Sequence, residues 1–530
     1  MSRMSEPTGH MFVAGSAVFG SGAKIRAVDP GTGEELEPAF AYGSDEDVDR
    51  ACEAAREAFG SYRALDPARR ARFLERIADN IDAVGVALLE RAHAESGLPM
   101  GRLTGERART TGQLRMFATL LREDGVEHPR IDPAQPDRTP APRADIRQRR
   151  VPLGPVAVFG ASNFPLAFSV GGGDTASALA AGCPVVVKAH DAHPGTSELV
   201  ARAVSAAVAD EGLPAGTFSL LFGSGPGLGV RLVMDPRIQA VGFTGSRSGG
   251  LSLLAAAQAR PRPIPVFAEM SSTNPVFLLP GALAERAEEI ADAFVGSLTA
   301  GAGQFCTNPG LVVAVDGPDL RRFLDTSAAA VGESAPATML TPAIAAAYEQ
   351  GLSALAAHPA VEVLARGAET ELPHRCRSAL LATDADSFTT DSALQHEVFG
   401  SSSLVIRCRD QEQVRKVAAH VEGQLTATVH ASESDRSEAG TLLESLELTA
   451  GRILFNGWPT GVEVGHAMVH GGPFPATSDS RTTSVGTLAV DRFLRPVAYQ
   501  DVPAELLPSS VRDTNPGSLW RRVDGELGRH

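Results

Sequence analysis

The sequence contains few cysteines, and these follow no recognisable pattern. Among 530 residues there are five, widely scattered: Cys52, Cys183, Cys306, Cys376 and Cys408. An odd, dispersed set without Cys-x-x-Cys spacing argues against a disulfide framework and against a zinc site. We therefore expect free thiols and no bound metal.

Long apolar runs and excess positive charge are also lacking. No apolar run reaches about 18 residues without a glycine or a charge, so no membrane span is expected. Lysine and arginine total 48 against 63 acidic residues, a net charge of −15, which argues against a nucleic-acid or anionic-membrane surface. The N-terminal stretch MSRMSEPTGHMFVAG lacks the apolar core of a signal peptide. These absences together predict a soluble, cytoplasmic protein.

The texture of the chain changes along its length. Apolar positions recur at helical spacing from Ser44, a plausible N-cap, to about Gly125. After Pro155, short apolar runs such as VAVFG, CPVVVKA and IQAVGFTG alternate with helical segments, and a second alternation runs over about 280–472. Such alternation predicts doubly wound parallel sheets, which bind ligands at the carboxyl ends of their strands.

Two segments lie outside this alternation. Residues 129–152 are rich in proline and charge, which by composition alone indicates a linker. The residues that end the chain, LPSSVRDTNPGSLWRRVDGELGRH, are expected to form a polar tail.

Polar side chains follow several of the predicted strands. Asn163, in VFGASNFPLAF, could donate a hydrogen bond to a developing oxyanion or simply satisfy a local turn. Lys188 ends the strand VVVK, where it suits ribose hydroxyls or phosphate, or is an ordinary lysine at a strand end.

A glycine-rich turn and a glutamate come next. In VGFTGSRSGG, Gly242, Gly245 and Ser246 precede a helix whose first N–H groups could meet a pyrophosphate, although the GxGxxG pattern is absent. Glu269, in VFAEMSSTNPVF, lies beside apolar residues that would raise its pKa and suit a general base. A lone glutamate is nonetheless usually structural or solvated.

The stretch AGAGQFCTNPG contains Cys306. Free cysteines are more often small buried hydrophobes than nucleophiles. Here glycines and the polar Gln304 and Asn308 flank the thiol, so a ligand could approach it closely. A helix N-terminus at this point would lower the pKa of the thiol and favour the nucleophilic thiolate.

Together these motifs resemble those of the NAD(P)-dependent aldehyde dehydrogenase superfamily, in the same order, over about residues 25–500. The matching motifs are Asn163, Lys188, GFTGS, Glu269, Cys306, HEVFG (396–400) and FNGWPTG (455–461). More narrowly, the segments FGASNFPLAF and GQFCTNPG resemble the 2-oxoglutarate semialdehyde (2,5-dioxopentanoate) dehydrogenase branch, close to broad-specificity and fatty-aldehyde enzymes. GQFC departs from the commoner Gln-x-x-Cys form.

The resemblance implies an α/β, aldehyde dehydrogenase-like fold with two doubly wound (Rossmann-type) domains and a small β oligomerisation flap. The implied boundaries are 1–130 and 155–278 for the cofactor-binding domain, 279–478 for the catalytic domain, 131–154 and 479–503 for the flap, and 504–530 for the tail. In this interpretation the proline-rich arm pairs with a C-terminal strand rather than forming a linker. A homodimer or homotetramer is then expected.

The resemblance also implies roles for three residues. Cys306 would attack the aldehyde, while Asn163 and the Cys306 backbone N–H would hold the oxyanion. Hydride transfer to the nicotinamide would leave a thioester, which water activated by Glu269 would hydrolyse. CoA-acylating relatives generally lack that glutamate, and a catalytically inactive binding protein would not need these residues.

The same resemblance predicts contacts with NAD or NADP. Lys188 and Glu397 would contact ribose hydroxyls, and Phe399 would pack near the nicotinamide ribose. In the glycine-rich turn that begins at Gly242, Gly245 and Ser246 would contact the pyrophosphate. NADP-preferring relatives carry a small neutral residue and an arginine where this chain has Asp191 and Pro226. A carboxylate at 191 would repel a 2′-phosphate, so NAD is favoured, although His190 and His193 could still admit NADP.

The substrate is the least determined part of the sequence-based prediction. A semialdehyde with a distal carboxylate needs a cation, and Arg109 and Arg115 lie on a helix expected near the substrate entrance; either could equally be a surface arginine. A long-chain aldehyde would instead need an apolar tunnel, which Phe117, Phe164, Phe168 and Phe474 could provide. Gln304 and Asn308, beside the nucleophile, are further candidates for substrate contact.

Overall fold

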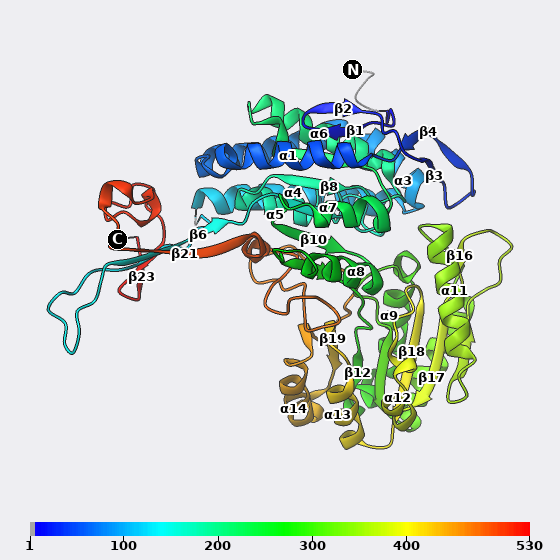
Figure 1. The fold of residues 1–530 in the computed structure, drawn as a ribbon. Helices are drawn as coiled ribbons and strands as arrows, with labels where there is room; N and C mark the ends of the chain where they lie inside the picture. The colour runs from blue at the N-terminus through cyan, green and yellow to red at the C-terminus, as the bar shows by residue number, and fades with distance from the viewer. Residues whose placement is uncertain (1–5, 124, 530) are drawn as a thin grey trace.

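The computed structural model describes residues 6–123 and 125–529 of the chain. The fold consists of two α/β units and a projecting five-stranded sheet (Figure 1). Within the described ranges, no helix is both long enough and apolar enough to cross a membrane.

The first unit is built on a seven-stranded sheet. Its strand order is β11 (Val266–Glu269), β10 (Ala240–Thr244), β7 (Val156–Phe159), β8 (Val185–Lys188), β9 (Phe218–Leu221), β1 (Met11–Val13) and β2 (Ser16–Val18). The five strands from β11 to β9 are parallel, and their short apolar runs are almost wholly buried. The chain proceeds outward from β7 to β9 and then returns to the other side of β7 as β10. This reversal of strand order is a topological switch point, where α/β sheets bind ligands.

Helices cover this sheet, as the upper half of Figure 1 shows. The first of them begins at a capping box in which Ser44 and Asp47 bond each other's backbone N–H groups. Their bounds are α1 (Asp45–Arg63), α2 (Pro67–Val84), α3 (Val86–Ser96), α4 (Met100–Glu123), α5 (Gly173–Ala181), α6 (Pro194–Asp210), α7 (Val230–Met234) and α8 (Arg247–Gln258). A hairpin of β3 (Lys24–Val28) and β4 (Glu35–Ala41) precedes α1.

The second unit repeats the design. Its strand order is β15 (Glu362–Arg366), β17 (Ala379–Asp384), β18 (Ser402–Cys408), β13 (Leu311–Val315), β12 (Val276–Leu278), β19 (Gln424–His430) and β20 (Ala450–Phe455). Only the β15–β17 pairing within it is antiparallel. The covering helices are α9 (Pro280–Thr299), α10 (Pro318–Glu333), α11 (Pro342–Ala356), α12 (Ala385–Thr390), α13 (Gln411–His420) and α14 (Arg436–Leu446). Two short strands, β14 (Ala337–Thr338) and β16 (Arg375–Cys376), pair separately.

After β20 the chain returns to the first unit. The Met270 N–H donates to the Ala476 carbonyl at 2.8 Å, and Glu269 forms an isolated antiparallel bridge with Thr477. Segment 456–493 therefore lies against the end of β11, where the carboxylate of Glu269 is found.

The projecting sheet joins distant parts of the chain. Its order is β21 (Leu494–Gln500), β6 (Ile146–Pro152), β5 (Arg130–Asp132), β22 (Arg521–Val523) and β23 (Glu526–Gly528), and it extends to the left in Figure 1. The pairing of β6 with β21 over seven residues shows that composition misled the linker prediction for 129–152.

The segment 504–530 was expected as a polar tail, but its described residues, 504–529, contribute two strands to the projecting sheet: β22 pairs in parallel with β5, and β23 pairs with β22. Arg147 forms an ion pair with Asp513 at 2.7 Å. Part of the polarity that suggested a tail lies in these strands, where Arg522 and Glu526 are exposed and Arg521 is buried.

Candidate active site

A cavity of about 840 Å³ lies where the carboxyl ends of the first unit's strands meet the amino ends of the second unit's strands. Its lining comes from loops after β7, β10 and β11 in the first unit and from α11 and the segment before β18 in the second. Of the residues predicted from sequence, Asn163, Glu269, Cys306, Glu397 and Phe399 all line it. The structure thus brings together side chains that lie far apart in the sequence.

One histidine links the thiol and the carboxylate in this cavity. The Nε2 atom of His470 is 2.9 Å from Oε1 of Glu269 and 3.4 Å from Sγ of Cys306. Each of these three side chains contributes one oxygen, nitrogen or sulfur atom to the cluster, and the three atoms all lie within 4.8 Å of one another. A single nitrogen therefore contacts both the candidate nucleophile and the candidate base.

Hydrogen bonds fix the orientation of Glu269 and His470. The Ser484 hydroxyl donates to Oε2 of Glu269 at 2.8 Å, and the His470 backbone N–H donates to Oγ1 of Thr483 at 2.8 Å. Both His470 and Glu269 are almost completely buried. Because His470 and Ser484 each bind a different oxygen of the Glu269 carboxylate, the side chain has little rotational freedom.

His470 is the residue that the sequence analysis missed. It stands in VHGGPFP, a stretch with neither helical nor strand periodicity. The available signal was the glycine pair after it. A Cβ on Gly471 would collide with the carbonyl oxygen of Thr482, so the backbone approaches another segment closely here.

The electrostatics of Glu269 differ from expectation. Burial by itself raises the pKa of the carboxyl, but the His470 charge and the hydrogen bonds from His470 and Ser484 outweigh it, and the pKa of Glu269 falls below its ordinary value. The sequence-based prediction of a raised pKa is therefore wrong, because it took no account of these partners.

The thiol also differs from expectation. Burial, followed by the negative charge of Glu269, raises the pKa of Cys306 well above its ordinary value. Cys306 lies in a turn rather than at a helix N-terminus, so the expected lowering of its pKa has no source there. In the resting site the sulfur is protonated and needs a base beside it.

Hydrogen bonds and close packing against neighbouring segments fix the backbone around Cys306. Nδ2 of Asn274, a residue with φ of 50°, donates to the carbonyl oxygens of Cys306 and Asn308, each at 2.9 Å. Gly303 has φ of 67°, and a Cβ there would overlap the backbone of Gly400. This close approach explains the glycine-rich sequence before the thiol.

Asn163 faces the same loop. Its Nδ2 donates to the Gln304 backbone carbonyl oxygen at 3.0 Å, and the backbone carbonyl of Asn163 accepts from Nη2 of Arg102 at 2.7 Å. An amide group has two N–H bonds. The bond to Gln304 therefore anchors the side chain and leaves one donor for a reacting oxygen.

The expected cofactor residues divide into two groups. Gly245 and Ser246 line the cavity at the start of α8, where the Ser246 hydroxyl accepts from the Gly249 N–H at 3.2 Å. Gly242 is buried within β10, where a Cβ would collide with Asp174, so the glycine serves packing. Its expected part in cofactor binding is not supported by this position, because it lies too early in the strand to reach the cavity.

Lys188 and Asp191 lie beside the cavity rather than among its lining residues, while His190 between them lines it. Oδ1 of Asp191 is 3.2 Å from Nζ of Lys188, and Oδ2 accepts from the Tyr42 hydroxyl at 2.8 Å. In the cavity itself, burial raises the pKa of Glu397 to about 8.

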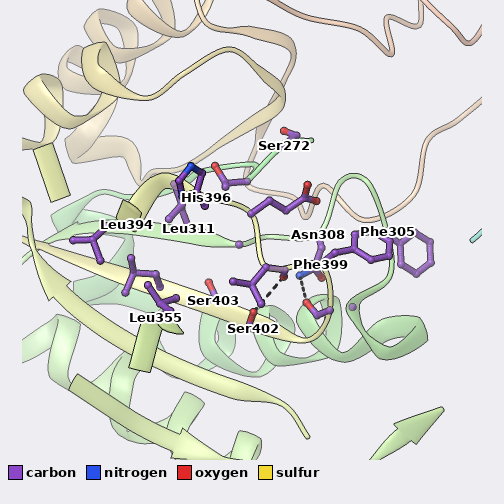
Figure 2. A pocket seen from close by; sticks show the side chains of 17 residues that line it. Ser272, Phe305, Asn308, Leu311, Leu355, Leu394, His396, Phe399, Ser402 and Ser403 are labelled. Carbon is purple, nitrogen blue, oxygen red and sulfur yellow. Dashed lines mark hydrogen bonds between the residues drawn. The ribbon is translucent and has the colours of Figure 1, made fainter. Parts of the chain in front are cut away.

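A small cavity of about 30 Å³ adjoins the nucleophile loop (Figure 2). There Nδ2 of Asn308 donates to the Gly400 carbonyl at 3.1 Å, one of the dashed lines in Figure 2. The Gln304 amide is fully buried, and its Oε1 accepts from the Leu340 N–H at 3.0 Å. Asn308 and Gln304 thus hold the loop to its neighbours, which corrects their proposed contact with substrate.

The remaining substrate candidates also separate. Arg115 is exposed and pairs with Asp79 and Asp82, which corrects its assignment to the substrate site. Arg115 follows Arg109 by six residues on the same helix, so the two side chains leave different faces of it. Arg109 lies in the interior, where its guanidinium carbon is 5.0 Å from the centroid of the Phe168 ring.

Of the phenylalanines, Phe164 is buried and contacts the Phe305 ring, 5.6 Å between centroids. Phe474 is 54% exposed beside Arg247, and Phe117 lies in the first unit's core, so neither walls an interior tunnel.

Comparison with known proteins agrees with this geometry. The model of the aldehyde dehydrogenase family matches residues 18–473. The alpha-ketoglutaric semialdehyde dehydrogenase 2 of Azospirillum brasilense is 57% identical over 520 residues, covering 98% of this chain and 99% of that protein. An alpha-ketoglutaric semialdehyde dehydrogenase of Acinetobacter baylyi is 47% identical over 525 residues, covering 99% of each.

Solved structures confirm the expected fold class. Betaine aldehyde dehydrogenase from Staphylococcus aureus, in complex with NAD+, superposes with a TM-score of 0.80 at 19% identity, covering 93% of this chain and 95% of that one. A putative aldehyde dehydrogenase from Burkholderia cenocepacia gives 0.77 at 22% identity, covering 93% and 100%. By sequence and by fold, the chain belongs to the aldehyde dehydrogenase family.

Proposed function

We propose that this enzyme oxidises 2-oxoglutarate semialdehyde (2,5-dioxopentanoate) to 2-oxoglutarate with NAD(P)+ as electron acceptor. The observation that carries the substrate is the 57% identity, over nearly the whole of both chains, to an alpha-ketoglutaric semialdehyde dehydrogenase. The cluster of Cys306, His470 and Glu269 supplies the groups that aldehyde oxidation needs.

The first step is attack by Cys306 on the aldehyde carbon. Because the pKa of the thiol is raised, a neighbouring base must take its proton, and the ionised Glu269 carboxylate, which is hydrogen-bonded to the thiol, is that base. His470 positions this carboxylate, because its Nε2–H donates to Oε1 of Glu269 at 2.9 Å. The oxyanion of the resulting thiohemiacetal accepts from the Asn163 amide and the Cys306 backbone N–H.

The chemistry that NAD(P)+ supplies when bound is acceptance of hydride from the thiohemiacetal carbon. Loss of the hydride from that carbon leaves a thioester on Cys306. Once Glu269 has released the thiol's proton to solvent, its carboxylate takes a proton from the attacking water and passes it to the sulfur that leaves, whose negative charge the Nε2–H of His470 stabilises. Hydrolysis releases the acid and restores the thiol.

The chain's residues fit a dinucleotide. The cavity of about 840 Å³ is of the size that cofactor sites have. The residues that start α8, Ser246 to Ser248, line it, so backbone N–H groups at the helix N-terminus are available to a pyrophosphate. Glu397 and Phe399 would hold the ribose near the nicotinamide, and Lys188 the hydroxyls of the other ribose.

We further infer that NAD is preferred over NADP. Asp191 is kept in place by Tyr42 and Lys188, and its carboxylate would repel a 2′-phosphate while accepting from a free 2′-hydroxyl. Pro226, in the turn after β9, supplies no positive charge to offset that repulsion.

The projecting sheet supports a homodimer or homotetramer. Its outermost strands, β21 and β23, each pair on one side only within the described residues, and an open strand edge can pair with a second subunit. Light scattering of the purified protein tests this assembly. The five unpaired cysteines fit a reducing compartment such as the cytoplasm.

The test of the function is a substrate panel. The purified enzyme is given 2,5-dioxopentanoate, succinic semialdehyde, glycolaldehyde or hexanal, with NAD or NADP, and reduced nicotinamide and acid product are measured. We expect the highest kcat/KM with 2,5-dioxopentanoate and no turnover by Cys306→Ala. A clear preference for hexanal would overturn the substrate, and turnover by the variant would overturn the mechanism.

A further inference from the structure

Two arginines on one face of α4 lie close to the nucleophile. Arg102 and Arg109 are seven residues apart, which is close to two turns, so their side chains leave the same face of the helix. Their guanidinium carbons are 4.9 and 5.9 Å from the centroid of the Phe164 ring. An ionised Cys306 would interact electrostatically with both.

These guanidinium groups are incompletely paired although they are in the interior. Nε and Nη2 of Arg109 are buried and have no hydrogen-bond partner among the described residues, and the same holds for Nη1 of Arg102. Buried polar groups are nearly always paired. No acceptor among the described residues pairs with these N–H groups, so they are available to a bound ligand.

The nearest carboxylate does not satisfy them. Glu106 lies between the two arginines on α4, but its Oε1 accepts from the N–H groups of Leu166 and Ala167 at 2.8 and 3.0 Å. Burial raises the pKa of Glu106, which weakens it further as a counter-charge. Glu463 also faces Arg109, but from the loop before His470.

Buried guanidinium N–H groups therefore remain without an acceptor beside the thiol. Because an unpaired buried charge destabilises a fold, such a pair is explained by the binding of an anion. The planar guanidinium fork matches a carboxylate in two parallel hydrogen bonds. Phe164, Phe168 and Phe305 provide the apolar walls for the carbon chain between carboxylate and aldehyde.

We propose that Arg109, together with the free Nη1 of Arg102, binds the carboxylate at the end of the substrate remote from the aldehyde. The inference rests on the proposed function, since it needs an aldehyde that carries a distal carboxylate. Arg102 has a second part, because its Nη2 holds the carbonyl of Asn163 at 2.7 Å. Binding of the carboxylate is thereby tied to the position of the oxyanion donor.

The experiment compares Arg109→Gln and Arg109→Met with Arg115→Gln, a matched control on the same helix whose arginine is exposed and already paired. We measure kcat/KM for 2,5-dioxopentanoate and for pentanal, an uncharged aldehyde of equal length. Loss of Arg109 is expected to reduce the ratio of the two by roughly 100-fold, mainly through the KM of the semialdehyde. Arg109→Lys is expected to recover part of the ratio, and Arg115→Gln to leave it unchanged.

Two further readouts separate the possible failures. The inhibition constant of 2-oxoglutarate against pentanal is expected to rise with loss of Arg109, whether or not the semialdehyde is a good substrate. Removal of an unpaired buried cation is expected to keep or raise Tm. The carboxylate site would be overturned if the Arg109 variants left both the ratio of kcat/KM values and the inhibition constant unchanged. It would also be overturned if Tm and pentanal turnover fell together in these variants. Poor wild-type turnover of 2,5-dioxopentanoate with Arg109-dependent inhibition intact would overturn the proposed substrate alone.

Discussion

The Nε2 atom of His470 lies 3.4 Å from the sulfur of Cys306, although 164 positions separate the two residues in the chain. The same nitrogen is 2.9 Å from Oε1 of Glu269, so thiol, imidazole and carboxylate form one cluster of contacting side chains. Burial and the Glu269 charge raise the pKa of the thiol, so the sulfur needs a base beside it to become a nucleophile.

Replacing His470 by asparagine is expected to slow thiol chemistry. Asparagine fills part of the space but cannot replace the charge and the Nε2–H of His470 that keep Glu269 ionised and in position, so kcat should fall by roughly 10²- to 10³-fold. Alkylation of Cys306 by iodoacetamide, followed by mass spectrometry, should slow in parallel. Equal alkylation rates in wild type and variant would show that the imidazole does not activate the sulfur.

Glu269→Gln is expected to separate two effects of the carboxylate. Its negative charge raises the pKa of Cys306, so its removal should shift the pH profile of Cys306 alkylation to lower pH. Steady-state turnover should nevertheless be lost, because water is no longer activated for thioester hydrolysis. Stopped-flow measurement should show a burst of reduced nicotinamide without a following steady phase. A profile shifted to higher pH would contradict the electrostatic account.

Cofactor binding is expected to release a proton near neutral pH. Glu397 has its pKa raised to about 8 by burial, so in the free enzyme it is mostly protonated there. Ribose hydroxyls donate to the ionised form and lower that pKa, so the carboxyl loses its proton on binding. Calorimetric titration with NAD in buffers of different ionisation enthalpy measures the proton count. Glu397→Gln should bring the count close to zero, and an unaltered count would exclude Glu397 as the source.

Asp191→Asn is expected to change cofactor preference. The amide keeps the size of the carboxylate and can still accept from Tyr42, but it no longer repels a 2′-phosphate. The ratio of kcat/KM for NADP to that for NAD should rise by roughly 10-fold or more. A wild-type enzyme that already prefers NADP would contradict the premise.

Asn274→Ala is expected to destabilise the nucleophile loop. The substitution removes the donor to the carbonyls of Cys306 and Asn308 and leaves alanine at φ of 50°. Two buried acceptors without partners cost about 2–4 kcal/mol in the free energy of unfolding. Urea denaturation measures this loss. Arg115→Gln serves as the exposed control, and its stability should change by less than about 1 kcal/mol.

The order of motifs was enough to predict the fold class and the residues that meet at the cavity. Short buried strands such as VVVK have a strong local signature, and Glu269 ends one of them, whereas Cys306 was predicted from the glycine-rich segment that precedes β13. What local sequence could not predict was the pKa of either group. The low pKa of Glu269 depends on His470, which arrives from a loop without periodicity, and the high pKa of Cys306 depends on burial and on Glu269.

The projecting sheet shows the opposite limit. Its strands β6 and β22 are polar and largely half-buried, so composition suggested a linker and a tail. Their pairing with distant segments is a tertiary property. Gly242 illustrates the same point on a smaller scale, since a motif glycine near the cofactor turn proved to be a packing position.

The pairing of β6 with β21 also sets an order of events during synthesis. Strand β6 leaves the ribosome long before Leu494–Gln500, its partner, has been translated. The nascent chain therefore carries an open strand edge through most of its elongation, and His470 and Ser484 are still missing from the nucleophile's surroundings. The hydrogen-bonded surroundings of Cys306 are therefore complete only when the polypeptide is nearly complete, at the stage when the open strand edge of β6 is also paired.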